Sequence, residues 1–108
     1  MSNWKTAIVT GAGSGIGKSI ALTLTREGYY VFLSDVSEDR LHRAILEAKK
    51  IGIADGELAD VSQAGQVERL FQRASSATNK IDILVNAAGI YDGYAGIEET
   101  SYELWHKI

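Results

Sequence analysis

The 108-residue chain is long enough for one domain, and its 45% hydrophobic and 23% charged residues are typical of a soluble globular protein. Its net charge of −3 argues against nucleic acid or an anionic membrane surface as the main partner. The absence of cysteine excludes disulfides and thiolate catalysis, and because no signal peptide and no apolar run of roughly 20 residues is present, we expect a cytoplasmic protein without a membrane span.

The first predicted elements are a strand, a glycine-rich turn and a helix. Residues 6–10 (Thr-Ala-Ile-Val-Thr) predict the strand, and residues 11–17 (Gly-Ala-Gly-Ser-Gly-Ile-Gly) form the turn, called the glycine loop below. Apolar residues at helical spacing predict a helix over 16–27, ended by Gly28 in a left-handed conformation. Glycines admit an anion close to backbone N–H groups, and a helix N-terminus is positive, so this order of elements predicts a nucleotide phosphate site.

Strands and helices alternate along the rest of the chain. Ser37 and Ser62 are expected to cap two further helices, and Thr100 with Glu103 forms a capping box for a fourth. Strands that alternate with helices of this length predict right-handed βαβ units and an α/β fold with a doubly wound parallel sheet. We expect the order β-α-β-α-β-α-β-α, a strand order of 3-2-1-4, and further strands over residues 29–34 (ending at Asp35), 53–58 (leading to Asp60) and 81–86.

Three nucleotide-binding motifs compete for residues 10–19. The dinucleotide motif G-x-G-x-x-G fails, because it requires a glycine at Ile16. The P-loop motif matches at residues 17–19 (Gly-Lys-Ser), although Ala12 stands where its first glycine belongs, so a P-loop nucleotide-binding protein stays an alternative. The third pattern, Thr-Gly-x-x-x-Gly-x-Gly, is satisfied by Thr10, Gly11, Gly15 and Gly17.

Four motifs in sequence order resemble the N-terminal, cofactor-binding half of the short-chain dehydrogenase/reductase family. They are residues 10–17, Asp35 at the end of a strand, Asp60-Val61 after the next strand, and residues 86–89 (Asn-Ala-Ala-Gly) after the last. The resemblance extends over residues 5–108. It implies a Rossmann-type NAD-binding domain over residues 1–108, an NAD(H)-dependent oxidoreductase of alcohol or ketone substrates, and a homo-oligomer.

The resemblance also implies a role for each matching residue. The pyrophosphate is bound by the glycine loop, the adenosine ribose by the carboxylate of the second strand, and the adenine by the segments after the third and fourth strands. In that order the residues are Gly11, Ser14, Gly15, Ile16 and Gly17; Asp35; Asp60 and Val61; and Asn86, Ala87, Ala88 and Gly89.

Asp35 decides the expected cofactor. A 2′-phosphate at this place meets a carboxylate, and no cation at Ala12, Ser14 or Val36 offsets the repulsion, so we expect NAD rather than NADP. Other interpretations remain open. Asp35 can instead cap the following helix, Asp60 and Ser62 can simply begin one, and Asn86 can hold the backbone; Lys18 is expected to be solvated.

The catalytic pair of the family, Tyr-x-x-x-Lys, is absent from these residues. No lysine stands four positions after any of the five tyrosines (Tyr29, Tyr30, Tyr91, Tyr94 and Tyr102). We therefore assign no catalytic residue and no metal ligand. We expect the N-terminal part of a longer dehydrogenase, truncated before its catalytic segment; the rival hypothesis is a non-catalytic module that binds an adenine dinucleotide.

Overall fold

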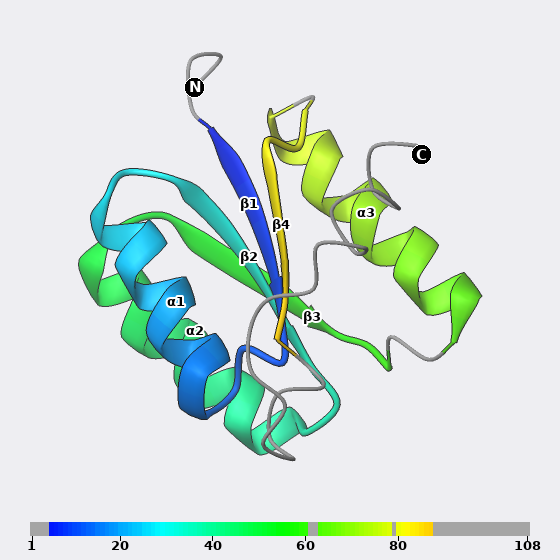
Figure 1. The fold of residues 1–108 in the computed structure, drawn as a ribbon, viewed down its shortest axis with the longest axis horizontal. Helices are drawn as coiled ribbons and strands as arrows, with labels where there is room; N and C mark the ends of the chain where they lie inside the picture. The colour runs from blue at the N-terminus through cyan, green and yellow to red at the C-terminus, as the bar shows by residue number, and fades with distance from the viewer. Residues whose placement is uncertain (1–4, 61–62, 79, 88–108) are drawn as a thin grey trace.

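The computed structural model describes residues 5–60, 63–78 and 80–87, which form a parallel sheet with helices on both faces (Figure 1). The strand order is β3-β2-β1-β4, as predicted. The helices α1 and α2 cover one face of the sheet and α3 covers the other (Figure 1). The elements are β1 (Thr6–Thr10), α1 (Gly15–Arg26), β2 (Tyr30–Asp35), α2 (Glu38–Ile51), β3 (Ala54–Leu58), α3 (Ala64–Thr78) and β4 (Ile83–Asn86).

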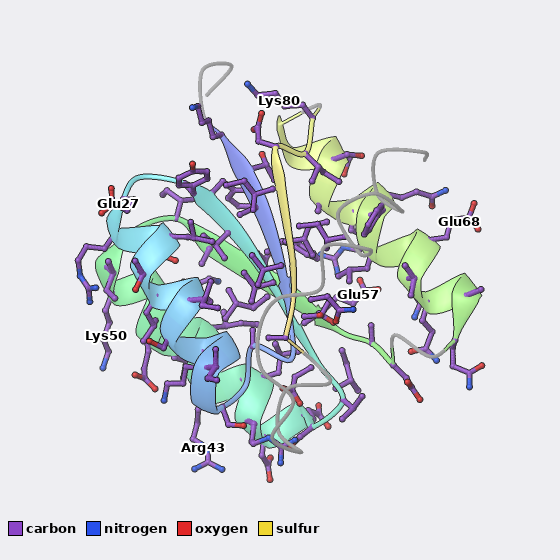
Figure 2. All side chains as sticks on the ribbon, in the orientation of Figure 1. Glu27, Arg43, Lys50, Glu57, Glu68 and Lys80 are labelled. Carbon is purple, nitrogen blue, oxygen red and sulfur yellow. The ribbon has the colours of Figure 1, made fainter. Side chains whose placement is uncertain are left out.

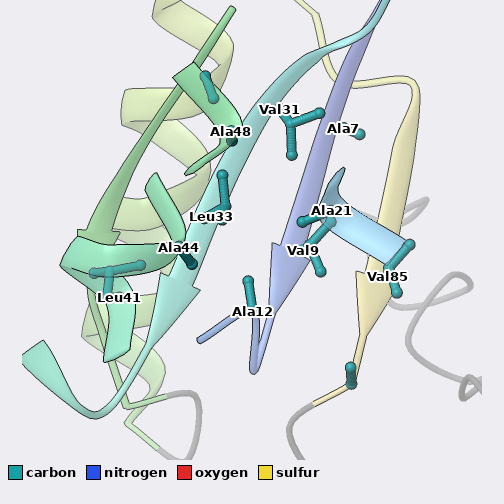
Figure 3. Packing of buried hydrophobic residues seen from close by; sticks show 12 residues of the cluster. Ala7, Val9, Ala12, Ala21, Val31, Leu33, Leu41, Ala44, Ala48 and Val85 are labelled. Carbon is teal, nitrogen blue, oxygen red and sulfur yellow. The ribbon is translucent and has the colours of Figure 1, made fainter. Parts of the chain in front are cut away.

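The core consists of two apolar layers separated by the sheet. Every residue of β1 and β2 is buried, as expected for parallel strands that are covered on both faces. In the layer beneath α1 and α2, small residues such as Ala21, Ala44 and Ala48 let these helices approach the strands closely (Figure 3). The layer beneath α3 contains Ile8 and Phe32 from the strands, and the apolar face of the helix, which consists of Val67, Leu70, Phe71 and Ala74.

Local sequence signals fix the ends of α1 and α2. Gly28 follows the end of α1 with φ 98°, in the left-handed region predicted for it. Ser37 accepts a hydrogen bond from the backbone N–H of Arg40 at 3.4 Å and caps α2 as predicted, and Gly52 ends that helix. The capping box at Thr100 and the cap expected at Ser62 lie outside the described residues.

The strand β4 is shorter than its apolar sequence predicts. It begins at Ile83 rather than at residue 81, because Asp82 contacts β1 through its side chain as well as its backbone. The Asp82 carboxylate accepts a hydrogen bond from the Thr6 N–H at 2.8 Å, while the Asp82 N–H donates to the Thr6 carbonyl at 2.8 Å. The strand β2 lies one residue later than predicted, with Asp35 as its last residue.

Charged side chains attach α3 to the sheet. Glu57, on β3 and labelled in Figure 2, accepts hydrogen bonds from Arg69 Nε at 2.8 Å and Arg73 Nη1 at 2.6 Å. The Arg73 guanidinium also lies 5.5 Å from the centre of the Phe32 ring, within the range of a cation–π contact. Burial raises the pKa of Glu57, but the hydrogen bonds from Arg73 and Arg69 outweigh it, so the pKa lies below its ordinary value.

None of the helices in the described ranges combines the length and the apolar character that crossing a membrane requires.

We expect Glu57→Gln to lower the free energy of unfolding by about 1 kcal/mol near pH 7, because it removes the charge that pairs with two arginines. Since folding lowers the pKa of Glu57, its contribution is complete above the ordinary glutamate pKa and is lost as the pH falls through the folded-state value. Urea titrations from pH 3 to pH 7 should therefore show that the free energies of unfolding of Glu57→Gln and of the parent chain converge as the pH falls.

The matched control is Glu68→Gln, which removes an exposed carboxylate of α3 that has no ion pair within the described chain. A difference between Glu57→Gln and the parent chain that stays constant over this pH range would contradict the role of the ion pairs.

Candidate functional site

The glycine loop follows the conformation that its glycines allow. Gly11 and Gly15 have φ values of 64° and 61°, a region that disfavours residues with a Cβ. Gly17 allows α1 to touch the start of the loop, because a Cβ there would lie 2.0 Å from the carbonyl oxygen of Gly11. The first helical turn thus lies directly against the carboxyl end of β1.

The N-terminus of α1 is open to an anion. Ser14, its N-cap residue, makes no side-chain hydrogen bond to the helix, and the first turn contains no acidic residue. The N-terminus of α2, in contrast, is capped by Ser37 and carries Glu38 and Asp39. Within residues 5–60, 63–78 and 80–87, backbone N–H groups in the first turn of α1 therefore have no competing side-chain acceptor, as a phosphate site requires.

Asp35 joins β2 to the glycine loop. Its side chain is only 5% exposed, and its Oδ2 accepts a hydrogen bond from the Gly13 N–H at 2.8 Å. Its Oδ1 accepts from the Ser37 N–H at 2.9 Å and from Arg40 Nη2 at 3.3 Å. A Cβ at Gly13 would lie 2.6 Å from Asp35 Oδ2, so only glycine permits this contact. The structure therefore places Asp35, the residue predicted to bind the ribose, against the loop, and its carboxylate also contacts the N–H of Ser37, the N-cap of α2.

Arg40 is the residue that the sequence analysis missed. The search for a cation near Asp35 covered Ala12, Ser14 and Val36, but the guanidinium comes from the first turn of α2. The N-cap predicted for α2 indicates the position of Arg40, because the third helical residue after an N-cap lies beside the backbone of that cap. Ser37 is the N-cap, so Arg40 occupies this position and lies close to Asp35.

A polar row crosses the face of the sheet that α3 covers, near the carboxyl ends of the strands. Glu57, Ser34, Thr10 and Asn86 are paired in register across all four strands. Thr10 Oγ1 donates to Asn86 Oδ1 at 2.7 Å, a contact between side chains that links β4 to β1. The Ser34 hydroxyl is buried and has no hydrogen-bond partner among the residues that the structure describes.

The other predicted site residues lie at the same edge of the sheet. Asp60 follows β3, and its carbonyl accepts from the Gln63 N–H at 2.9 Å just before α3. Ala87, buried, follows β4, and Ile16 is 53% exposed on α1. Three predicted residues, Val61, Ala88 and Gly89, lie outside the described residues.

Lys18 was predicted to be solvated, but the structure pairs it with an acidic side chain. Its Nζ lies 2.5 Å from Glu47 Oε2, which links α1 to α2. A P-loop lysine has to contact the phosphates, and this ion pair instead holds the ammonium group at the neighbouring helix. Over the described part of the chain, no group of three histidine or acidic residues is placed to hold a metal ion.

Comparisons with known proteins match both the sequence and the fold of this chain. The family model for short chain dehydrogenases matches residues 5–108. A short chain dehydrogenase/reductase of Gibberella zeae is 32% identical over 104 residues, which cover 96% of this chain and 38% of that protein. The chain therefore spans well under half the length of this curated relative.

Two solved structures are similar in both fold and sequence. One is a short chain dehydrogenase/reductase from Burkholderia phymatum in complex with NAD, with a TM-score of 0.72, 35% identity, and coverage of 75% of this chain and 29% of that one. The other is an actinorhodin polyketide ketoreductase with NADPH, with a TM-score of 0.78, 34% identity, and coverage of 100% and 41%.

We expect Gly17→Ala to destabilise the chain by about 3 kcal/mol, because the added Cβ would overlap the Gly11 carbonyl group and force α1 away from β1. Thermal and urea unfolding followed by circular dichroism measure this. The control is Gly65→Ala in α3, where a Cβ meets nothing within 4 Å and the change should be neutral or slightly stabilising. Equal stability of the two variants would show that α1 does not lie against Gly11.

Proposed function

The chain belongs to the short-chain dehydrogenase family, and on that basis we propose that it is the cofactor-binding part of an NAD(H)-dependent oxidoreductase acting on an alcohol or a ketone. The observation that carries the proposal is the buried Asp35 carboxylate held against a glycine loop at the open N-terminus of α1. These groups suit the two ends of an ADP-ribose unit, since backbone N–H groups bind the pyrophosphate and a carboxylate accepts from ribose hydroxyls.

The residues of this chain bind and orient the cofactor. The first turn of α1 and the loop N–H groups hold the pyrophosphate, and Gly17 keeps that turn close to β1. Asp35 accepts a ribose hydroxyl on a lone pair that its three protein donors leave open, which fixes the adenosine end. When bound, the nicotinamide supplies the hydride acceptor or donor. We assign no catalytic residue to these 108 residues.

NAD is the proposed cofactor because a 2′-phosphate would approach the carboxylate of Asp35. The related structures were solved with NAD in one case and NADPH in the other, so the fold accommodates both. For the whole enzyme we further propose a small alcohol or ketone substrate, a homo-oligomer and a cytoplasmic location.

Calorimetric titration with NAD, NADP and Mg-ATP tests this function. We expect NAD to bind more tightly than NADP. Asp35→Asn should weaken NAD binding roughly tenfold and reduce the difference in affinity between NAD and NADP, because it removes the charge that ribose hydroxyls bind and a 2′-phosphate avoids.

Lys18→Ala is the matched control, since the lysine pairs with Glu47 rather than with the loop, and it should leave NAD affinity within about twofold. Tight binding of Mg-ATP that is lost in Lys18→Ala, with no effect of Asp35→Asn, would refute the dinucleotide site and favour a P-loop protein.

A further inference from the structure

The outer edge of β3 presents backbone groups with which another strand can pair. Among the described strands, β3 lies at one end of the order and pairs with β2 alone. The Val31 N–H donates to the Ile53 carbonyl at 3.2 Å, which sets the alternation of this parallel pair. Odd-numbered residues of β3 thus bond to β2, whereas the N–H and carbonyl of Gly56, at the middle of the strand, point away from β2 to the outer edge.

Gly56 leaves the middle of this edge without a side chain. A Cβ there would lie 2.3 Å from the Leu33 carbonyl oxygen and 2.8 Å from Ile45 Cδ1, so β2 and α2 leave no room for one. Strand edges are commonly protected from pairing by charged side chains, and glycine provides none. Ile53 and Leu58, near the two ends of β3, are each 44% exposed, and a paired strand would cover part of both. This edge therefore combines outward-facing backbone groups with apolar side chains that favour association.

Asp55 supplies the protection that Gly56 lacks. Its Oδ1 accepts a hydrogen bond from the Gly56 N–H at 2.8 Å, so the outward donor at the middle of β3 is already bound within the strand. Hydrogen bonds to a carboxylate are stronger than those between neutral groups. An approaching strand would have to displace this oxygen before its own carbonyl reached the Gly56 N–H. The carboxylate therefore closes the edge at the residue where no side chain covers it.

We propose that the Asp55 carboxylate is an autoinhibitory contact that prevents two copies of this chain from pairing antiparallel through β3. A two-fold axis at Gly56 would place the glycines of the two copies opposite each other. Each Gly56 N–H would then donate to the carbonyl of the other Gly56, and the missing side chains would let the backbones approach. The partner is a second copy because its edge carries the same donor, acceptor and exposed apolar residues, so that each copy satisfies the other.

Sedimentation and hydrogen exchange of the purified chain test this contact. Because a dimer gains two freed N–H groups, we expect Asp55→Ala to lower the dimer dissociation constant about a hundredfold, roughly tenfold for each group. Exchange over residues 53–59 should slow as the concentration of this variant rises. Asp55→Asn keeps an oxygen that accepts from Gly56 and loses only the charge, so its association should stay within about threefold of the parent chain.

Glu68→Ala is the matched control, since it removes one exposed carboxylate from α3 and should leave association unchanged. Asp55→Ala that associates no more than the parent chain, or that associates without slower exchange over residues 53–59, would overturn the role of Asp55. Equal association of Asp55→Asn and Asp55→Ala would also overturn it, because the charge alone would then be responsible.

A second measurement needs no variant. In the parent chain, the Gly56 amide should exchange with solvent more slowly than the amide of Leu58, which points to the same edge of β3. Nuclear magnetic resonance resolves the two amides. Faster exchange at Gly56 than at Leu58 would show that the carboxylate does not hold this N–H.

Discussion

The buried carboxylate of Asp35 is the constraint on which the arrangement of this site depends. A charge removed from water requires hydrogen-bond partners, and here the partners come from the glycine loop and from the start of α2. The Ala12 N–H adds a second link between the loop and β2, to the Ser34 carbonyl at 2.9 Å. A displacement of β2 along β1 would break these contacts together, so the pairing of the strands and the shape of the loop are fixed jointly.

The fold could be predicted from the sequence because its signals are local. Apolar periodicity, the glycines and the Ser37 cap identified the helices and strands, and βαβ connections then left the order 3-2-1-4. The loop and Asp35 could be predicted for the same reason, since both occur at strand ends. The start of β4 could not, because it depends on a contact between Asp82 and Thr6, which are 76 residues apart.

Most of the charged contacts could not be predicted, since they depend on how one element packs on another. The partners of Glu57 and Lys18 come from other elements, from α3 and α2 respectively. Propensity scales describe residues singly and contain no information about such pairs. Arg40 is different, because it lies five residues after Asp35 in the first turn of the helix that Ser37 caps, and its contact could have been predicted from that cap.

The central position of β1 has a consequence for the order in which the sheet is completed. A chain is synthesised from its N-terminus, and β2 can pair with β1 as soon as the intervening α1 has formed. The other edge of β1 belongs to β4, which the ribosome makes only after α2, β3 and α3. Among the described strands, the one buried most deeply is thus made first and enclosed last, and its backbone groups stay open to other strands throughout that interval.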